Sequence, residues 1–142
     1  RLLKMMLSDI LTRKVFVDSD DLAHLDSLFD QVRCHTETLV VLCTTEILGR
    51  PWCVGEITVA HINKVKATLL MYPDFMLPSD VWLAQVTQHV SFETLTSHAL
   101  TETMVRSALL AMRNVSSIPM PSMPTYQRLD RLIDTLLAGK AE

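Results

Sequence analysis

Residues 38–56 read Thr-Leu-Val-Val-Leu-Cys-Thr-Thr-Glu-Ile-Leu-Gly-Arg-Pro-Trp-Cys-Val-Gly-Glu, an apolar run that leads through a turn into a second apolar segment. The run from Thr38 to Cys43 does not alternate between polar and apolar residues. A strand of this kind is covered on both faces, which is typical of a central strand in a parallel sheet. After the turn, Pro51 is well placed to begin a helix, which we expect to extend to about Val65.

The preceding and following segments continue this alternation of strand and helix. Apolar residues at helical spacing predict helices at residues 2–12 and 22–32. Short β-branched or apolar runs predict strands at residues 14–18 and 67–72. Because strands and helices alternate with short connections, we expect an α/β fold of the doubly wound type, with a parallel sheet between helices. Ligands of such sheets bind at the carboxyl ends of the strands.

The pattern after residue 78 is less regular. Ser79 and Asp80 favour the start of a short helix, because their side chains accept hydrogen bonds from backbone N–H groups. Residues 88–92 predict a small edge strand. Residues 101–114 predict a clearer helix, because its apolar residues recur on one side.

The C-terminal part begins with a Pro/Met-rich segment at residues 116–124. Its three prolines exclude a central strand and a helix interior, so we expect an extended connector. A last helix follows at about residues 125–138, with Gly139 as its C-cap. The expected organisation is therefore an α/β domain at residues 1–115, the connector, and a C-terminal segment at residues 125–142 whose helix packs on the domain.

Composition excludes several functional classes. With 142 residues, of which 49% are hydrophobic and 20% charged, the chain is expected to fold as one domain. A net charge of −3 gives no electrostatic reason to expect nucleic acid as a partner. No apolar run approaches the roughly 20 residues that span a bilayer, so no membrane span is expected. The chain begins at Arg1 with residues that already have a helical pattern, so we interpret it as part of a longer polypeptide.

The metal-ligating and nucleotide-binding residue types are sparse or scattered. Three cysteines without a CxxC pair predict neither a disulfide framework nor a zinc site, and they favour a reducing, cytoplasmic setting. The five histidines have no metal-ligand spacing, so no metal is expected. Only three glycines are present, which excludes a glycine-rich phosphate loop.

Three stretches have to be considered together: Val15-Phe-Val-Asp-Ser-Asp-Asp-Leu22, Thr38-Leu-Val-Val-Leu-Cys-Thr44 and Trp52-Cys-Val-Gly-Glu-Ile57. Together they resemble a TIR domain, and their sequences are most similar to TIR-like proteins of unicellular eukaryotes. The resemblance covers residues 1–75 well and the remainder loosely. It implies a flavodoxin-like three-layer fold with a parallel sheet. The first, central strand of the family is missing from this chain and would have to precede Arg1.

The resemblance implies one of two functions, either assembly with other TIR-like domains in a larger protein complex or cleavage of the nicotinamide–ribose bond of NAD. In the enzymes of the family, the glutamate of the Trp-x-x-x-Glu stretch is the catalytic carboxylate, which corresponds to Glu56. The resemblance places the nucleotide beside Asp18, Ser19 and Asp20, beside Thr44 and Thr45, and near Trp52. No cofactor is required, and NAD is a candidate substrate.

The spacing of Trp52 and Glu56 is compatible with that role. At about 100° per residue, the two side chains lie about 40° apart around a helix. A carboxylate at the ligand-binding edge can stabilise the positive charge that develops as nicotinamide leaves. The alternatives are that Glu56 is only favoured by the helix dipole and that Trp52 only packs in the core.

The acidic run after the first predicted strand has alternative interpretations. Asp18, Asp20 and Asp21 could bind magnesium or accept a phosphoryl group, as in response regulators of similar topology. They could equally cap the following helix. A phosphoacceptor is the weaker hypothesis, because no lysine stands at the end of a late strand to complete its site.

Overall fold

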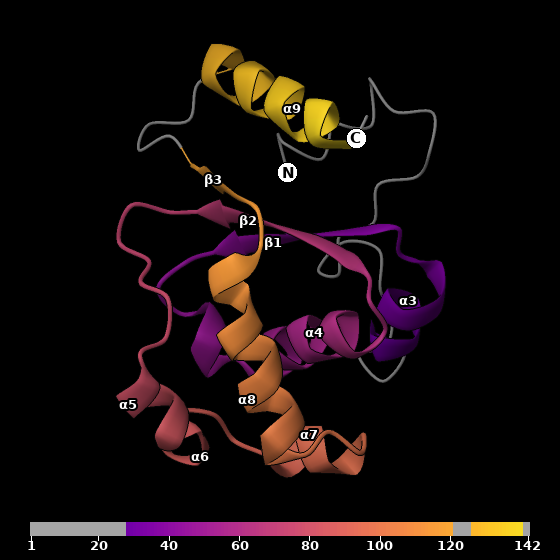
Figure 1. Cartoon of the computed structure of the whole chain (residues 1–142), viewed down its shortest axis with the longest axis vertical. Helices are drawn as coiled ribbons and strands as arrows, with labels where there is room; N and C mark the ends of the chain where they lie inside the picture. The colour runs from indigo at the N-terminus through magenta and orange to yellow at the C-terminus, as the bar shows by residue number, and fades with distance from the viewer. Residues whose placement is uncertain (1–27, 121–125, 141–142) are drawn as a thin grey trace. The chain divides into compact units, whose positions relative to one another are not determined.

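The computed structural model describes residues 28–120 and 126–140 (Figure 1). The chain divides into two compact units, one formed by His24–Pro119 and the other by Arg1–Ala23 together with Met120–Glu142. The helix and strand predicted at residues 2–12 and 14–18 lie outside the described residues.

The described part of the second unit is mainly one helix, α9 (Tyr126–Lys140). Its buried side chains recur at helical spacing, as the sequence predicts, and are Leu129, Leu132 and Ile133. Gly139, predicted as the C-cap, lies inside α9 instead. The C-terminal helix is therefore confirmed, with an end later than predicted.

The larger unit contains a parallel sheet of three strands, β1 (Thr38–Cys43), β2 (Lys66–Met71) and β3 (Ser117–Pro119), in the order β1-β2-β3. Val41 pairs with Leu69 across β1 and β2. Helices flank the sheet, so the predicted α/β class is confirmed and the architecture is consistent with a flavodoxin-like fold. The two strands predicted at residues 38–43 and 67–72 are both present.

Two helices connect these strands, α4 (Pro51–Ile62) between β1 and β2, and α8 (Glu102–Ala111) before β3. Each strand is added on the same side of the previous one, in the order β1-β2-β3. Because connections between parallel strands are right-handed, both helices then lie on the same face of the sheet. The two helices pack against each other, and α8 crosses α4 on its way to β3 (Figure 1).

Helix α4 ends three residues before the predicted position, and the reason is local. The N–H of Lys64 donates to the carbonyl oxygen of His61 at 3.3 Å, and that of Val65 donates to Ala60 at 2.9 Å. This is the Schellman arrangement, whose turning residue takes a positive φ. Lys64 has φ 56°, so the turning residue here is a lysine instead of the usual glycine.

Short helices fill the chain between β2 and α8, namely α5 (Asp80–Ala84), α6 (Val86–His89) and α7 (Glu93–Ser97). The predicted start at Ser79 is confirmed, because its hydroxyl accepts a hydrogen bond from the N–H of Trp82 at 3.1 Å. The strand predicted at residues 88–92 is wrong. Two of its residues belong to α6, and the N–H of Val90 donates to the carbonyl oxygen of Val86 at 3.0 Å, as at a helix end.

Among the described residues, the remaining elements are α3 (Leu28–His35) and two short 3-10 helices, η2 (Ile47–Gly49) and η3 (Met112–Asn114). Part of the predicted connector forms β3, and the N–H of Leu69 donates to the carbonyl oxygen of Ser116 at 2.9 Å. The extended conformation of this segment was predicted, whereas its pairing with β2 was not. Pro119 is tolerated because it is the last residue of β3, at the end of the described strand order.

Candidate functional site

Trp52 belongs to a cluster of three rings at the start of α4. Its ring centroid lies 5.3 Å from that of Phe29 and 5.4 Å from that of His98, and the latter two rings are 4.9 Å apart. Phe29 is almost fully buried, while Trp52 and His98 are half-buried. Packing alone therefore explains why a tryptophan stands at position 52, because its ring contacts side chains of α3 and of the end of α7.

Gly55 allows this packing. A Cβ added at this position would collide with the ring of Phe29, so any larger residue would push α3 away from α4. The glycine of the Trp-Cys-Val-Gly-Glu stretch therefore has a structural role that does not depend on a ligand.

The other predicted site residues that the structure describes follow β1 in the chain. Thr44 follows the strand directly, and its carbonyl oxygen accepts a hydrogen bond from the N–H of Ile47 at 3.3 Å. Thr44 is half-buried, Thr45 is exposed, and Glu56 is half-buried one turn after Trp52 in α4. Asp18, Ser19 and Asp20 lie outside the described residues.

A cavity of about 850 Å³ opens elsewhere, between α4, α8 and the sheet. We call it the α4–α8 groove. Its apolar floor includes Val41 and Leu69 from paired positions of β1 and β2, both of which are buried. Neither Trp52 nor Glu56 is among the described residues that line it. The ring cluster and the groove are therefore different places on α4.

The rim of the α4–α8 groove is polar. His61 and Lys64 at the end of α4 and Ser107 of α8 line it, and all three are exposed. Nε2 of His61 lies 3.4 Å from Oγ of Ser107, which connects the two helices across the rim.

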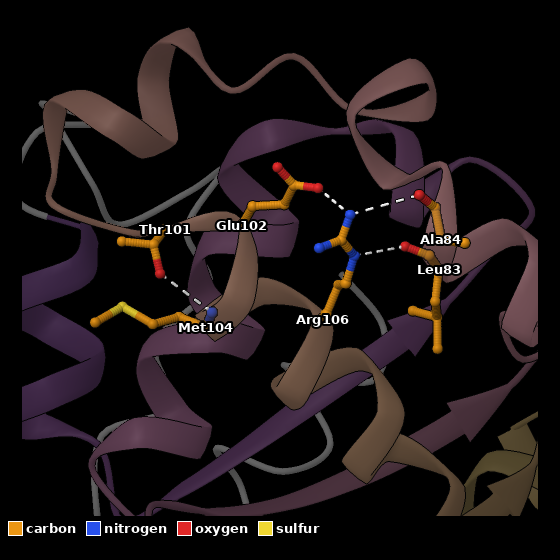
Figure 2. Close-up of polar contacts among 6 residues, drawn as sticks. All are labelled: Leu83, Ala84, Thr101, Glu102, Met104 and Arg106. Atoms are coloured by element: carbon orange, nitrogen blue, oxygen red, sulfur yellow. Dashed lines mark hydrogen bonds and ion pairs between the residues drawn. The ribbon is translucent and has the colours of Figure 1, made fainter.

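Helix α5 is held at both ends by arginines. Arg106 of α8 donates from Nε to the carbonyl oxygen of Leu83 at 2.9 Å and from Nη2 to that of Ala84 at 3.4 Å, and it also pairs with Glu102 (Figure 2). These carbonyls belong to the last turn of α5, where a cation is favourable.

At the other end, Arg113 of η3 donates from Nη2 to the carbonyl oxygen of Pro78 at 3.0 Å and to Oδ1 of Asp80 at 2.9 Å. Helix α5 is thereby tied to α8 and η3 by side chain–backbone bonds at each end.

The held segment carries exposed apolar side chains. Met76 is 83% exposed and Val81 is 70% exposed, which makes them the two most exposed large apolar residues of the described chain. Beside Val81, the ring of Trp82 stacks on that of His89, with centroids 4.8 Å apart and planes 6° apart. We call these four residues, Met76, Val81, Trp82 and His89, the α5–α6 surface.

The cysteines differ in accessibility. Cys43 in β1 is fully buried, and burial raises the pKa of its thiol to about 11. Cys34 is exposed and Cys53 is half-buried, and none of the three cysteines forms a disulfide. A thiol that holds its proton at neutral pH is a poor nucleophile, so Cys43 is a core residue.

No protein-family model matches this chain, and no curated protein and no solved structure is significantly similar to it. None of the described helices is long and apolar enough to cross a membrane. The TIR resemblance therefore depends on the quoted motifs alone, and the geometry has to carry any functional argument.

Sequence reasoning missed the arginine contacts and the groove. Arg106 and Arg113 are seven residues apart in the helix predicted at residues 101–114, and that spacing puts two cations on one side. The alanines of α4, β2 and α8 were the corresponding signal for the groove. Neither signal identifies the element on the other side of the contact.

Proposed function

We propose that this chain is a TIR-like domain that acts in protein–protein assembly, and that copies of the domain associate through the α5–α6 surface. The observation that carries this proposal is the exposure of Val81 on α5, whose two ends are fixed by Arg106 and Arg113, and of Met76 in the loop that precedes α5.

The residue types of the α5–α6 surface suit an interface. Methionine and aromatic residues are enriched in protein interfaces. The Trp82–His89 stack presents a flat aromatic platform next to Val81. The exposed carboxylate of Asp80, whose side chain is 87% exposed, supplies polar character at the edge.

Fixing α5 in advance favours association. A mobile segment would lose conformational entropy when a partner binds, whereas a segment already ordered loses less. The hydrogen bonds of Arg106 and Arg113 tie the segment to α8 and η3 without covering Met76 or Val81. Assembly through contacts between like domains is also what the TIR resemblance implies.

Sedimentation equilibrium over a wide range of protein concentration tests this proposal. The unmodified chain is expected to self-associate, and Val81→Asp is expected to weaken the association by at least about tenfold. Ile62→Lys is the matched control, because Ile62 is also exposed, at 44%, but lies at the end of α4. Each new charge suits its helix end, Asp in the first turn of α5 and Lys in the last turn of α4, so neither should damage the fold.

A monomer at every concentration would contradict the proposal. So would equal effects of Val81→Asp and Ile62→Lys, because they would show that any exposed apolar residue contributes alike. Circular dichroism of both variants confirms that the fold is kept.

The second candidate function is NAD cleavage with Glu56 as the catalytic carboxylate. The observation that favours it is the position of a half-buried acid one turn into a helix that follows the carboxyl end of β1. Partial burial shields a carboxylate from water and strengthens its interaction with a developing positive charge. The α4–α8 groove does not contribute, so NAD would have to bind near Thr44 and Thr45.

Incubation with NAD and measurement of released nicotinamide tests this candidate. If it is right, the chain releases nicotinamide and Glu56→Gln lowers the rate by at least about a hundredfold. Glu46→Gln is the control, because Glu46 is an exposed acid in the turn between β1 and α4. Absence of turnover, or equal rates for the two variants, would remove the enzyme hypothesis.

A further inference from the structure

The α4–α8 groove exists because small side chains meet where the helices cross the sheet. Its lining includes one alanine of α4, one of β2 and two of α8, namely Ala60, Ala67, Ala108 and Ala111. Ala60 and Ala108 are each 2% exposed, so they form the packed base of the groove. Protein interiors are close-packed, and an opening of about 850 Å³ lies within the roughly 300–1,000 Å³ of small-molecule sites.

The chemistry of the groove is divided between floor and rim. Val41 and Leu69 on the floor are apolar and buried, whereas His61, Lys64 and Ser107 on the rim are exposed. Among the described residues that line the groove there is no aspartate or glutamate, and Lys64 is the cation. A complementary ligand has an apolar body and an anionic head group.

The backbone of Lys64 gives a second, independent observation. It occupies the left-handed turning position after α4, with φ 56°, where glycine is strongly favoured. Residues kept in such strained positions are often held there for a functional side chain. Ala99, with φ 63°, has the same position after α7 and is not among the lining residues, so it provides an internal comparison.

We infer that the α4–α8 groove binds a long-chain fatty acid. The acyl chain lies along the floor between α4 and α8, where it removes apolar surface from water. The carboxylate lies at the rim, where Lys64 offers an ammonium group and the His61–Ser107 pair offers further hydrogen-bonding atoms. This inference is independent of the α5–α6 surface and of Glu56.

Binding of cis-parinaric acid to the full chain, followed by its fluorescence and by displacement with palmitate, tests the inference. Saturable binding is expected. Lys64→Gly relieves the strained backbone, so it is expected to raise the melting temperature and yet to weaken palmitate binding about tenfold. Ala99→Gly relieves the same strain after α7 and is expected to leave palmitate binding unchanged. Hexadecanol, which has the chain without the carboxylate, is expected to bind Lys64→Gly and the unmodified chain equally.

A third variant, Ala111→Leu, narrows the groove with a larger side chain and is expected to weaken binding. Lack of saturable binding by the folded, unmodified chain would overturn the inference. It would also be overturned if Lys64→Gly bound palmitate as tightly as Ala99→Gly, or if folded Ala111→Leu kept full affinity. Because Lys64→Gly should be more stable than the unmodified chain, its loss of binding cannot be explained by unfolding.

Discussion

Nε of Arg106 donates to the carbonyl oxygen of Leu83 at 2.9 Å, a bond between residues 23 positions apart in the chain. Leu83 is buried, so this carbonyl has little access to water. The bond therefore fixes the end of α5 on α8 and sets the position of the apolar side chains that α5 presents (Figure 2).

Replacing Arg106 by methionine should lower the free energy of unfolding by about 1–2 kcal/mol, because it leaves the carbonyl of Leu83 without its donor. Urea denaturation measures this change. Arg50→Met is the control: Arg50 makes an ion pair with Glu46 at 2.8 Å, but both side chains are largely exposed, so a change below about 0.5 kcal/mol is expected. Equal losses of unfolding free energy for the two variants would show that the contact of Arg106 with α5 contributes no more than an exposed ion pair.

Gly55→Ala should destabilise the fold by about 1–3 kcal/mol, because the new methyl group overlaps the ring of Phe29. Gly49→Ala is the matched control, since nothing lies within 4 Å of a Cβ at Gly49, and it should be nearly neutral. Adding Phe29→Leu to Gly55→Ala should make the loss smaller than the sum of the two single losses. Additive losses would mean that the two residues do not constrain each other.

Thr101→Ala should cost about 1 kcal/mol, because Oγ1 of Thr101 accepts a hydrogen bond from the N–H of Met104 at 3.2 Å and caps α8 (Figure 2). Thr101→Ser keeps the acceptor and should be close to neutral. Thr103→Ala, an exposed position inside the same turn, should be neutral or slightly stabilising. Thermal unfolding of the three variants measures the order of their stabilities. If Thr103→Ala lost more stability than Thr101→Ala, the cap could not be the cause of the destabilisation.

The thiol of Cys43 should make the fold weaker above pH 9. Burial raises its pKa from the usual 9.0 to about 11 in the folded chain. Below pH 9 both states keep the proton, and between pH 9 and 11 only the unfolded state loses it, so stability falls as pH rises. The expected loss reaches about 2–3 kcal/mol once the pH exceeds 11, measured as the difference in pH dependence between the unmodified chain and Cys43→Ala. Parallel pH profiles would contradict this account.

Sequence patterns were sufficient for the elements whose signals are local. Thr38–Cys43 is almost entirely apolar, Ser79 caps α5 with its side chain, and Pro51 begins α4. Each signal depends on residues within one turn or one strand. The parallel order of the strands followed from the alternation of strand and helix.

Predictions were wrong where contacts beyond a short local pattern, or a residue unusual for its position, determine the structure. Residues 88–92 contain an apolar pattern short enough to suit a strand, but Val86 and Val90 are four residues apart and both are buried, as at the end of a helix. The end of α4 was predicted too late, because a lysine takes the position that glycine usually marks.

For the candidate site, the sequence placed Thr44, Thr45, Trp52 and Glu56 after β1 and at the start of α4, where the structure has them. It did not identify what Trp52 contacts, because Phe29 and His98 are distant in sequence. The arginine contacts of α5 and the α4–α8 groove also depend on which elements meet, and no local pattern contains that information.

Hydrogen exchange measured by mass spectrometry at low and high protein concentration tests the proposed assembly most directly. If copies associate through the α5–α6 surface, exchange in peptides that cover residues 75–89 slows at high concentration, while exchange in α4 stays the same. Unchanged exchange in residues 75–89 at concentrations where sedimentation detects association would contradict the account.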